Sequence, residues 1–120
     1  MTPIVYGIPN CDTIKKTLDW FRKHNIEVTF HNYKKEGISK TLLNNWIKQV
    51  GWEVLLNKKG TTWKQLSEAE QASATNGKAV ATLLAEHTSM IKRPVITLDS
   101  QVCVVGFDEA ALLELAAKCK

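Results

Sequence analysis

Cys11 is the residue of this 120-residue sequence whose type and position best suit chemistry. The apolar run Ile4-Val5-Tyr6 before it predicts a short buried strand, and the pattern after it predicts a helix from Thr13 to His24, with Asp12 or Thr13 as its cap. The N–H groups and positive dipole at a helix start favour a thiolate, which is the nucleophile of thiol chemistry. We predict that Cys11 is reactive; a buried structural cysteine is the alternative.

The third residue after Cys11 is Ile14, so the loop has no C-x-x-C pair and cannot form an internal disulfide. A single-cysteine enzyme needs a second thiol to resolve its intermediate. That thiol is an outside one such as glutathione, or else Cys103 or Cys119. We interpret Cys103 as part of the core and Cys119 as an incidental residue of the C-terminal tail. No two cysteines or histidines have the spacing of zinc ligands, so no metal site is predicted.

Two further segments contain candidate binding residues. Arg93 precedes Pro94 at a predicted strand start, where its guanidinium can offer a forked donor to an oxyanion or a carboxylate; a solvated surface charge is the alternative. The segment 51–63 reads as a loop rich in tryptophan, lysine and threonine. Within it, Asn57 and Thr61 can line an anion pocket, and the tryptophans are expected to pack the segment onto the core.

The elements that must position these residues follow a recognisable order. Residues 26–33 alternate like a strand with one wet face, which predicts a parallel pair with the first strand. Residues 37–88 read as a helical insertion. Strands over 95–98 and 102–105 form a hairpin, and a last helix covers 109–118. The expected fold is therefore α/β: one thioredoxin-like, glutaredoxin-type domain over 1–120, with a mixed sheet and an inserted helical subdomain.

Composition limits the possible functions. The chain is 44% hydrophobic and 23% charged, which is typical of a globular protein. Its net charge of +4 is too small to argue for nucleic-acid binding. No apolar stretch approaches the ~20 residues of a membrane helix, and no signal peptide is recognisable at the start. Three widely spaced cysteines indicate free thiols in a reducing compartment, so a cytoplasmic location is expected.

Four segments together resemble a known family. They are Tyr-Gly-Ile-Pro-Asn-Cys-Asp-Thr at 6–13, the segment 51–63, Ile-Lys-Arg-Pro-Val at 91–95 and Val-Gly-Phe at 105–107. In this order they resemble the arsenate reductase/Spx family, most closely its YffB-like branch. The resemblance implies the fold derived above, Cys11 as the nucleophile, Arg93 as the stabiliser of an anion beside it, and Pro94 as a cis proline.

The departures from the family pattern separate three hypotheses. Arsenate-reducing members carry further arginines, where this sequence has Asn57 and, before Gly106, Val104 and Val105. Spx-type regulators contact RNA polymerase and use a C-x-x-C switch, which Ile14 removes. The resemblance to the YffB-like branch implies a glutathione-dependent thiol reductase. Glutaredoxin-coupled arsenate reduction and polymerase binding are the alternatives.

We therefore expect a thiol oxidoreductase without a bound cofactor. Its catalytic residues are Cys11 and Arg93. Its partners are glutathione or a small thiol or disulfide substrate, and glutaredoxin in the arsenate alternative, with neither nucleic acid nor membrane. The residues expected to bind substrate surround the cysteine or lie in the other two segments: Asn10, Asp12, Thr13, Lys15, Asn57, Thr61 and Pro94.

Overall fold

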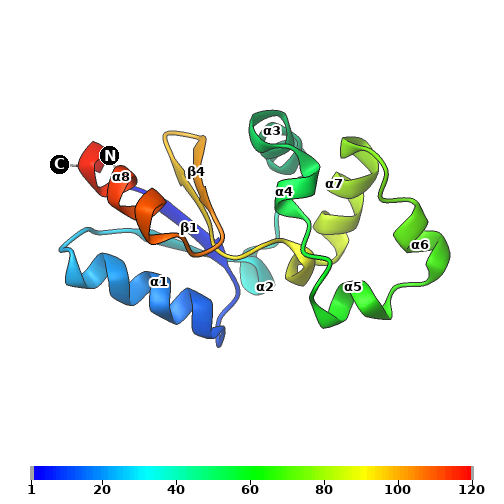
Figure 1. Cartoon of the computed structure of the whole chain (residues 1–120), viewed down its shortest axis with the longest axis horizontal. Coiled ribbons are helices and arrows are strands. Elements are labelled where there is room, and N and C mark those ends of the chain that lie inside the picture. The colour runs from blue at the N-terminus through cyan, green and yellow to red at the C-terminus, as the bar shows by residue number, and fades with distance from the viewer. Residues whose placement is uncertain (1, 120) are drawn as a thin grey trace. The chain divides into compact units, whose positions relative to one another are not determined.

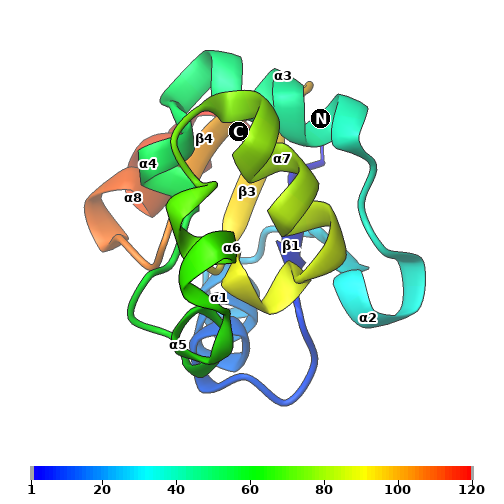
Figure 2. The same ribbon diagram turned by 90° about the vertical axis from the view of Figure 1, so that its right-hand side faces the viewer.

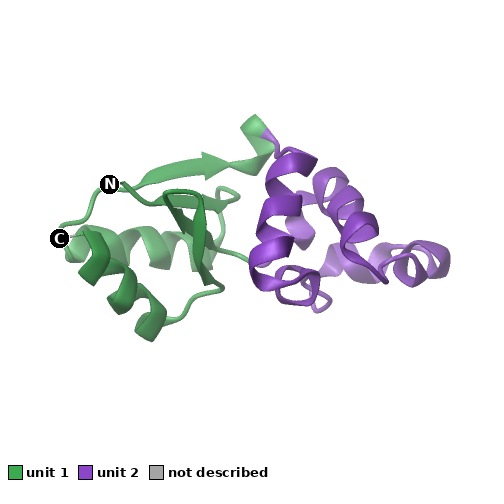
Figure 3. Cartoon of the chain, turned by 90° about the horizontal axis from the view of Figure 1, so that it is seen from above, with its two compact units in different colours: residues 1–36, 93–120 green, residues 37–92 purple. Residues whose placement is uncertain are grey.

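The computed structural model describes residues 2–119, which form two compact units, residues 2–36 with 93–119 and residues 37–92 (Figure 3). The first unit carries the sheet. In chain order its elements are β1 (Ile4–Gly7), α1 (Asp12–Lys23), β2 (Thr29–Asn32), α2 (Tyr33–Glu36), β3 (Val95–Leu98), β4 (Gln101–Val105) and α8 (Glu109–Cys119).

The sheet is mixed and four-stranded, in the order β2-β1-β3-β4, of which Figure 1 labels β1 and β4. β1 and β2 are parallel, whereas β3 runs antiparallel to both β1 and β4. Asp99 and Ser100, both with positive φ, make the tight turn between β3 and β4. The predicted parallel pair and hairpin are confirmed, and so is the thioredoxin-like α/β fold.

The core of the first unit lies between the sheet and two helices. Val5 of β1 and Ile96 of β3 are fully buried and belong to one hydrophobic cluster with Phe21 of α1 and Leu112 of α8. Complete burial of one such side chain stabilises the fold by roughly 1.5–3 kcal/mol. These contacts fix α1 on the sheet, and α1 is the helix that follows Cys11.

Several helix ends are set by residues that cap or stop helices. Ser39 caps α3 (Lys40–Val50) through Leu42 N–H, and Gly51, with φ of 91°, ends it. Asn25 has a φ of 56° just after α1, and Asp108 accepts a hydrogen bond from Ala111 N–H at the start of α8. These local signals act through backbone groups that the helix itself cannot pair.

The second strand differs from its prediction. The pattern predicts a strand over 26–33, but β2 covers only Thr29–Asn32. Tyr33 leaves the strand and begins the single helical turn α2, where Asn32 Oδ1 accepts a hydrogen bond from Lys34 N–H and Glu36 accepts one from Asn32 N–H. The alternation of apolar and polar residues does not reveal where β2 ends, because the turn after it is closed by hydrogen bonds of local polar side chains.

The second unit is helical throughout the elements that the structure describes in it. They are α3, α4 (Trp52–Leu55), α5 (Thr61–Gln65), α6 (Glu68–Ala72), α7 (Gly77–Glu86) and the 3₁₀ turn η1 (Thr88–Met90). α3 and α7 lie beside each other (Figure 2), and a Cβ on Gly77 would lie 3.0 Å from Ile47 Cγ2. The capping box of Ser67 and Glu70 begins α6.

The segment 51–63, predicted as a loop, contains α4 and begins α5. Each of these helices is about one turn long, too short for apolar periodicity to be recognised. Their tryptophans, Trp52 and Trp63, are half-buried, and the ammonium of Lys58 lies 5.9 and 5.5 Å from their ring centroids.

Gly7→Ala is expected to lower the free energy of unfolding by about 1–3 kcal/mol, because overpacking forces neighbouring groups apart. Gly7 ends β1, and a Cβ there would overlap the side chain of Ile14, which is 2% exposed on the first turn of α1. Urea unfolding measures the loss. Gly7→Ala with Ile14→Val should lose less than the sum of the two single changes; strict additivity would contradict this packing.

Candidate active site

Cys11 is the N-cap residue of α1, with φ of −111° and ψ of 125°. Its carbonyl accepts a hydrogen bond from Lys15 N–H at 3.0 Å, and its side chain is partly exposed. The predicted caps Asp12 and Thr13 are wrong, because α1 begins at Asp12 and its N-cap residue is Cys11, which makes no side-chain cap hydrogen bond. Backbone N–H groups in the first turn of a helix have no partner within the helix, so they suit an anionic sulfur.

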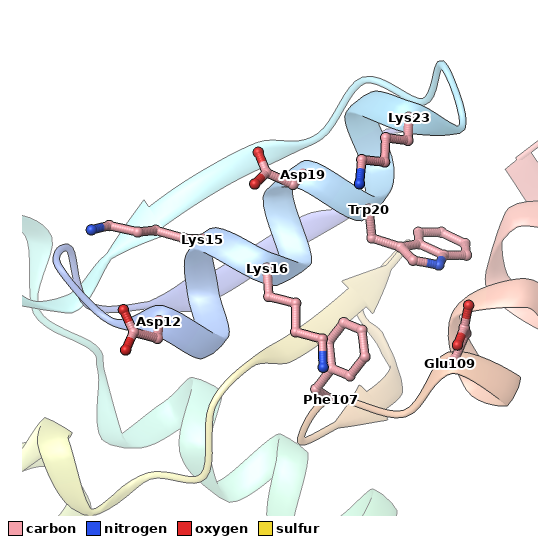
Figure 4. A pocket seen from close by; sticks show the side chains of 8 residues that line it. All are labelled: Asp12, Lys15, Lys16, Asp19, Trp20, Lys23, Phe107 and Glu109. Carbon is pink, nitrogen blue, oxygen red and sulfur yellow. The ribbon is translucent and has the colours of Figure 1, made fainter.

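The other residues predicted around the cysteine are brought together at the start of α1. Asn10 is exposed and has a φ of 58°, so the chain turns sharply just before Cys11. Asp12 and Lys15 are exposed and line a pocket of about 480 Å³ along α1 (Figure 4). Thr13 is partly buried, and its carbonyl accepts a 2.7 Å hydrogen bond from Thr17 Oγ1.

Arg93 and Pro94 lie at the same edge of the sheet as the loop that contains Cys11. Tyr6 in β1 pairs with Val95 in antiparallel β3, so the end of β1 and the start of β3 are neighbours. The Arg93–Pro94 peptide bond is cis, as expected. Pro94 is buried and its carbonyl accepts a hydrogen bond from Gly106 N–H at 2.8 Å, whereas Arg93 is partly exposed.

An aromatic cluster at this sheet edge was not predicted from the sequence. The rings of Tyr6 and His31 lie 4.8 Å apart, and Tyr33 lies 6.2 Å from Tyr6 and 5.8 Å from His31. The His31 side chain is only 23% exposed. The parallel register of β1 and β2 brings the cluster together, and no pattern within one strand reveals that register.

Tyr33 is the buried polar residue of this cluster. It is 2% exposed, and its hydroxyl has no hydrogen-bond partner among the described residues. Burial raises the pKa of Tyr33 far above its ordinary value, and Tyr6 raises it further, whereas the positive charge of Arg93 lowers it. The Arg93 guanidinium therefore lies within electrostatic reach of the Tyr33 hydroxyl.

Stability is expected to fall more steeply above pH ~10 in the parent than in Tyr33→Phe, by about 1.4 kcal/mol per pH unit. Burial keeps Tyr33 protonated in the folded state, so above pH ~10 only the unfolded state releases this proton. The stabilisation is complete below pH ~10 and is lost as the pH rises. Urea midpoints from pH 8 to 11 measure it; parallel losses in the two proteins would contradict the burial of this hydroxyl.

Asn57 and Thr61 belong to the second unit. Asn57 lines a pocket of about 310 Å³ together with Trp52, Leu56, one carboxylate, Glu53, and three lysines, Lys58, Lys59 and Lys92. Its backbone N–H donates to Met90 O at 2.8 Å, and its Oδ1 accepts from Lys59 N–H at 3.1 Å. Thr61 is exposed and does not line this pocket. Asn57 therefore lies among side chains whose net charge is positive and suits an anion. Thr61 lies outside this pocket.

The three cysteines are all free and partly buried. Cys103 in β4 and Cys119 at the end of α8 both pack against the core cluster of the first unit. Cys119 is thus the last residue of a helix, where a tail was expected. Among residues 2–119, no group of three histidine, cysteine or acidic side chains is arranged to hold a metal ion. No helix of this described part is long and apolar enough to span a membrane.

Two solved structures share this architecture. One described as YffB (PA3664) protein is 38% identical, with a TM-score of 0.88, covering 94% of this chain and 97% of that one. An arsenate reductase (ArsC) related protein from Brucella melitensis is 41% identical, with a TM-score of 0.75, covering 95% of this chain and 93% of that one.

Sequence comparison identifies the family. An uncharacterized protein of Haemophilus influenzae is 44% identical over 105 residues, 88% of this chain and 90% of its own. The regulatory protein MgsR of Bacillus subtilis is 26% identical over 115 residues, 94% of this chain and 89% of its own. The ArsC family pattern matches residues 6–115, which confirms the resemblance seen in the sequence. This chain therefore belongs to the ArsC family.

Proposed function

We propose that this chain is a glutathione-dependent thiol–disulfide reductase with Cys11 as its single nucleophile. The observation that carries the proposal is the position of Cys11 as the partly exposed N-cap of α1, where its side chain makes no cap hydrogen bond. Lys15 and Lys16, one turn further on, add positive charge, and Asp12 partly offsets it. The Cys11 sulfur is therefore reachable, and the formal charges of these neighbours are on balance positive.

The proposed reaction begins when the Cys11 thiolate attacks one sulfur of a substrate disulfide. The substrate S–S bond breaks, a mixed disulfide with Cys11 forms, and the leaving sulfur departs as a thiolate that takes a proton from water. A glutathione thiolate then attacks the Cys11 sulfur of the mixed disulfide, which releases the second substrate thiol and leaves glutathione joined to Cys11. A second glutathione thiolate attacks the glutathione sulfur of that disulfide, which forms glutathione disulfide and releases the Cys11 thiolate. The substrate gains two electrons as two thiols, and the two glutathiones become glutathione disulfide.

An outside thiol is required because α1 offers no second cysteine. Ile14, three residues after Cys11, is 2% exposed and packs under the end of β1. Cys103 and Cys119 lie in β4 and at the end of α8. Arg93, at the sheet edge that carries the loop before Cys11, is proposed to bind a glutathione carboxylate or the reacting sulfur. Use of glutathione agrees with the cytoplasmic location expected from the sequence.

Arsenate reduction is the second candidate, because the family and the Brucella melitensis protein are named for it. The charges of this chain argue against it. The sequence has two arginines, and Arg22 is exposed near the end of α1 and pairs with Asp19 at 2.6 Å. Arg93 is the other arginine of the sequence, so a single guanidinium would have to bind a multiply charged oxyanion. The regulatory alternative has a relative in MgsR, but Ile14 removes the C-x-x-C switch.

Parallel assays of one preparation test the proposal. With glutathione as reductant, hydroxyethyl disulfide should turn over, and arsenate with added glutaredoxin should turn over at least about 100-fold more slowly. The physical reason is that each missing charge-assisted hydrogen bond to the oxyanion removes ~1.5–3 kcal/mol. Arsenate turnover equal to disulfide turnover, and lost in Cys11→Ser, would establish the second candidate. Turnover of neither substrate would favour a regulator.

A further inference from the structure

The pocket of about 480 Å³ in the first unit is a groove along α1 (Figure 4). One wall is a single stripe of that helix, from Asp12 at its start to Lys23 at its end, and the other wall consists of Phe107 and Glu109. Eleven residues of helix rise by about 16 Å. The groove begins at the residue next to Cys11 and continues well beyond it.

Trp20 lies in this groove and carries an unsatisfied donor. It is 7% exposed, and its Nε1 is buried with no hydrogen-bond partner among the described residues. A buried indole N–H usually has a partner, and leaving it without one is unfavourable. In Figure 4 the indole nitrogen lies on the edge of the ring nearest to Glu109, on the groove side of α1.

The orientation of this donor is held by its neighbours. The His24 ring stacks on the indole with centroids 3.8 Å apart, and Phe21 packs edge-on at 5.3 Å. Lys16, Lys23 and Glu109, which line the groove together with Trp20, have long and exposed side chains. Nε1 is buried, so an incoming oxygen must move the groups that cover it before it reaches the N–H.

The charges of the groove favour a neutral acceptor over an oxyanion. Three lysines and three carboxylates line it, so its formal charges cancel. Asp19 is already paired with Arg22 at 2.6 Å, and the Lys16 ammonium lies 4.2 Å from the Phe107 ring centroid. A groove without excess positive charge does not concentrate anions. A backbone carbonyl oxygen can accept a hydrogen bond from the indole N–H and carries no formal charge.

We propose that this groove binds an extended polypeptide segment that flanks the cysteine of a protein disulfide attacked by Cys11, with a backbone carbonyl of the segment accepting from Trp20 Nε1. An extended chain covers 16 Å with about five residues. The inference rests on the proposed function, and it names a polypeptide as the substrate class of the same cysteine.

Glutathione itself is too short for this role. Trp20 follows Cys11 by nine residues, which is about 13 Å along the helix axis. A fully extended tripeptide spans about 10 Å, and the sulfur of glutathione leaves from its middle residue. Glutathione bound to Cys11 therefore occupies only the near end of the groove. The far end distinguishes a polypeptide substrate from the small reductant.

Substrates with a common leaving group test this inference. Capped six-residue peptides, with a cysteine at one end or the other, and a single capped cysteine are each converted to the 2-pyridyl disulfide. Release of pyridinethione gives the single-turnover rate with Cys11. One of the peptides should react about fivefold to tenfold faster than the capped cysteine, as expected for one gained hydrogen bond. In Trp20→Phe the ratio of the two rates should fall to near one, whereas in Trp63→Phe it should stay at the parent value.

A second measurement keeps the test decisive if Trp20→Phe folds poorly. In the parent, a six-residue peptide with serine in place of cysteine should shift the Trp20 indole N–H proton resonance downfield. Equal rates for the peptides and the capped cysteine, or an unshifted resonance at saturating peptide, would overturn the groove assignment. If the capped cysteine itself fails to react at Cys11, the proposed function fails instead.

Discussion

Cys11→Ser is expected to lower the rate of glutathione-driven disulfide reduction on the order of 10³-fold or more. The reason is that residue 11 then lacks the thiol that forms the mixed disulfide with the substrate. A serine hydroxyl is not appreciably ionised near neutral pH, and the N–H groups at the start of α1 cannot change that. The fold should be unaffected, since Cys11 is a partly exposed N-cap residue without a side-chain hydrogen bond to the helix.

The other two cysteines provide matched controls. Cys103→Ser and Cys119→Ser remove thiols that pack against the core cluster, so each should cost some stability and keep most of the exchange rate. Rates are measured with hydroxyethyl disulfide and glutathione, and thermal unfolding is followed in the same samples. If Cys11→Ser retains activity while Cys103→Ser or Cys119→Ser loses it, the nucleophile is assigned to the wrong cysteine.

Arg93→Ala is expected to weaken glutathione binding about 30-fold, which corresponds to losing ~2 kcal/mol of charge-assisted hydrogen bonding. Arg93 is partly exposed at the edge of the sheet that carries the Cys11 loop, beside a cis proline. Arg93→Lys keeps the charge and loses the forked geometry, so it should restore binding only in part. Calorimetric titration of the Cys11→Ser background with glutathione measures all three affinities without exchange chemistry.

Arg22→Ala is the control for this change, because Arg22 is the second arginine and its exposed ion pair with Asp19 contributes little. It should bind glutathione like the parent. A large drop in the unfolding temperature of Arg93→Ala would make Arg93 a structural residue. The same conclusion would follow if Arg93→Ala bound glutathione as tightly as the parent.

The parts of the fold that depend on local signals were predictable from the sequence. The cap of α3 at Ser39, the capping box of Ser67 and the stop at Gly51 are each set by a few neighbouring residues. Helix α7 was expected from its apolar spacing, although its cap, Asn76, was not. The parallel pairing of β1 with β2 follows from the handedness of the crossover through α1.

The residues that were missed depend on register and packing. Tyr33 and His31 meet Tyr6 only because β2 ends early and pairs in one register with β1. Trp20 reads as one more apolar position of α1, and its unsatisfied Nε1 becomes visible only when its surroundings are known. Cys11 could be proposed from the sequence because its signal, a cysteine between a strand and a helix, is local.

The most direct test of the central claim is the site at which glutathione attaches. The folded protein is incubated briefly with a small excess of glutathione disulfide, and the adducts are located by mass spectrometry of the intact chain and of its peptides. A single adduct on Cys11, formed much faster than any on Cys103 or Cys119 and removed by reduced glutathione, is the predicted result. A first adduct on either of the other cysteines, with Cys11 left unmodified, would contradict the proposed mechanism.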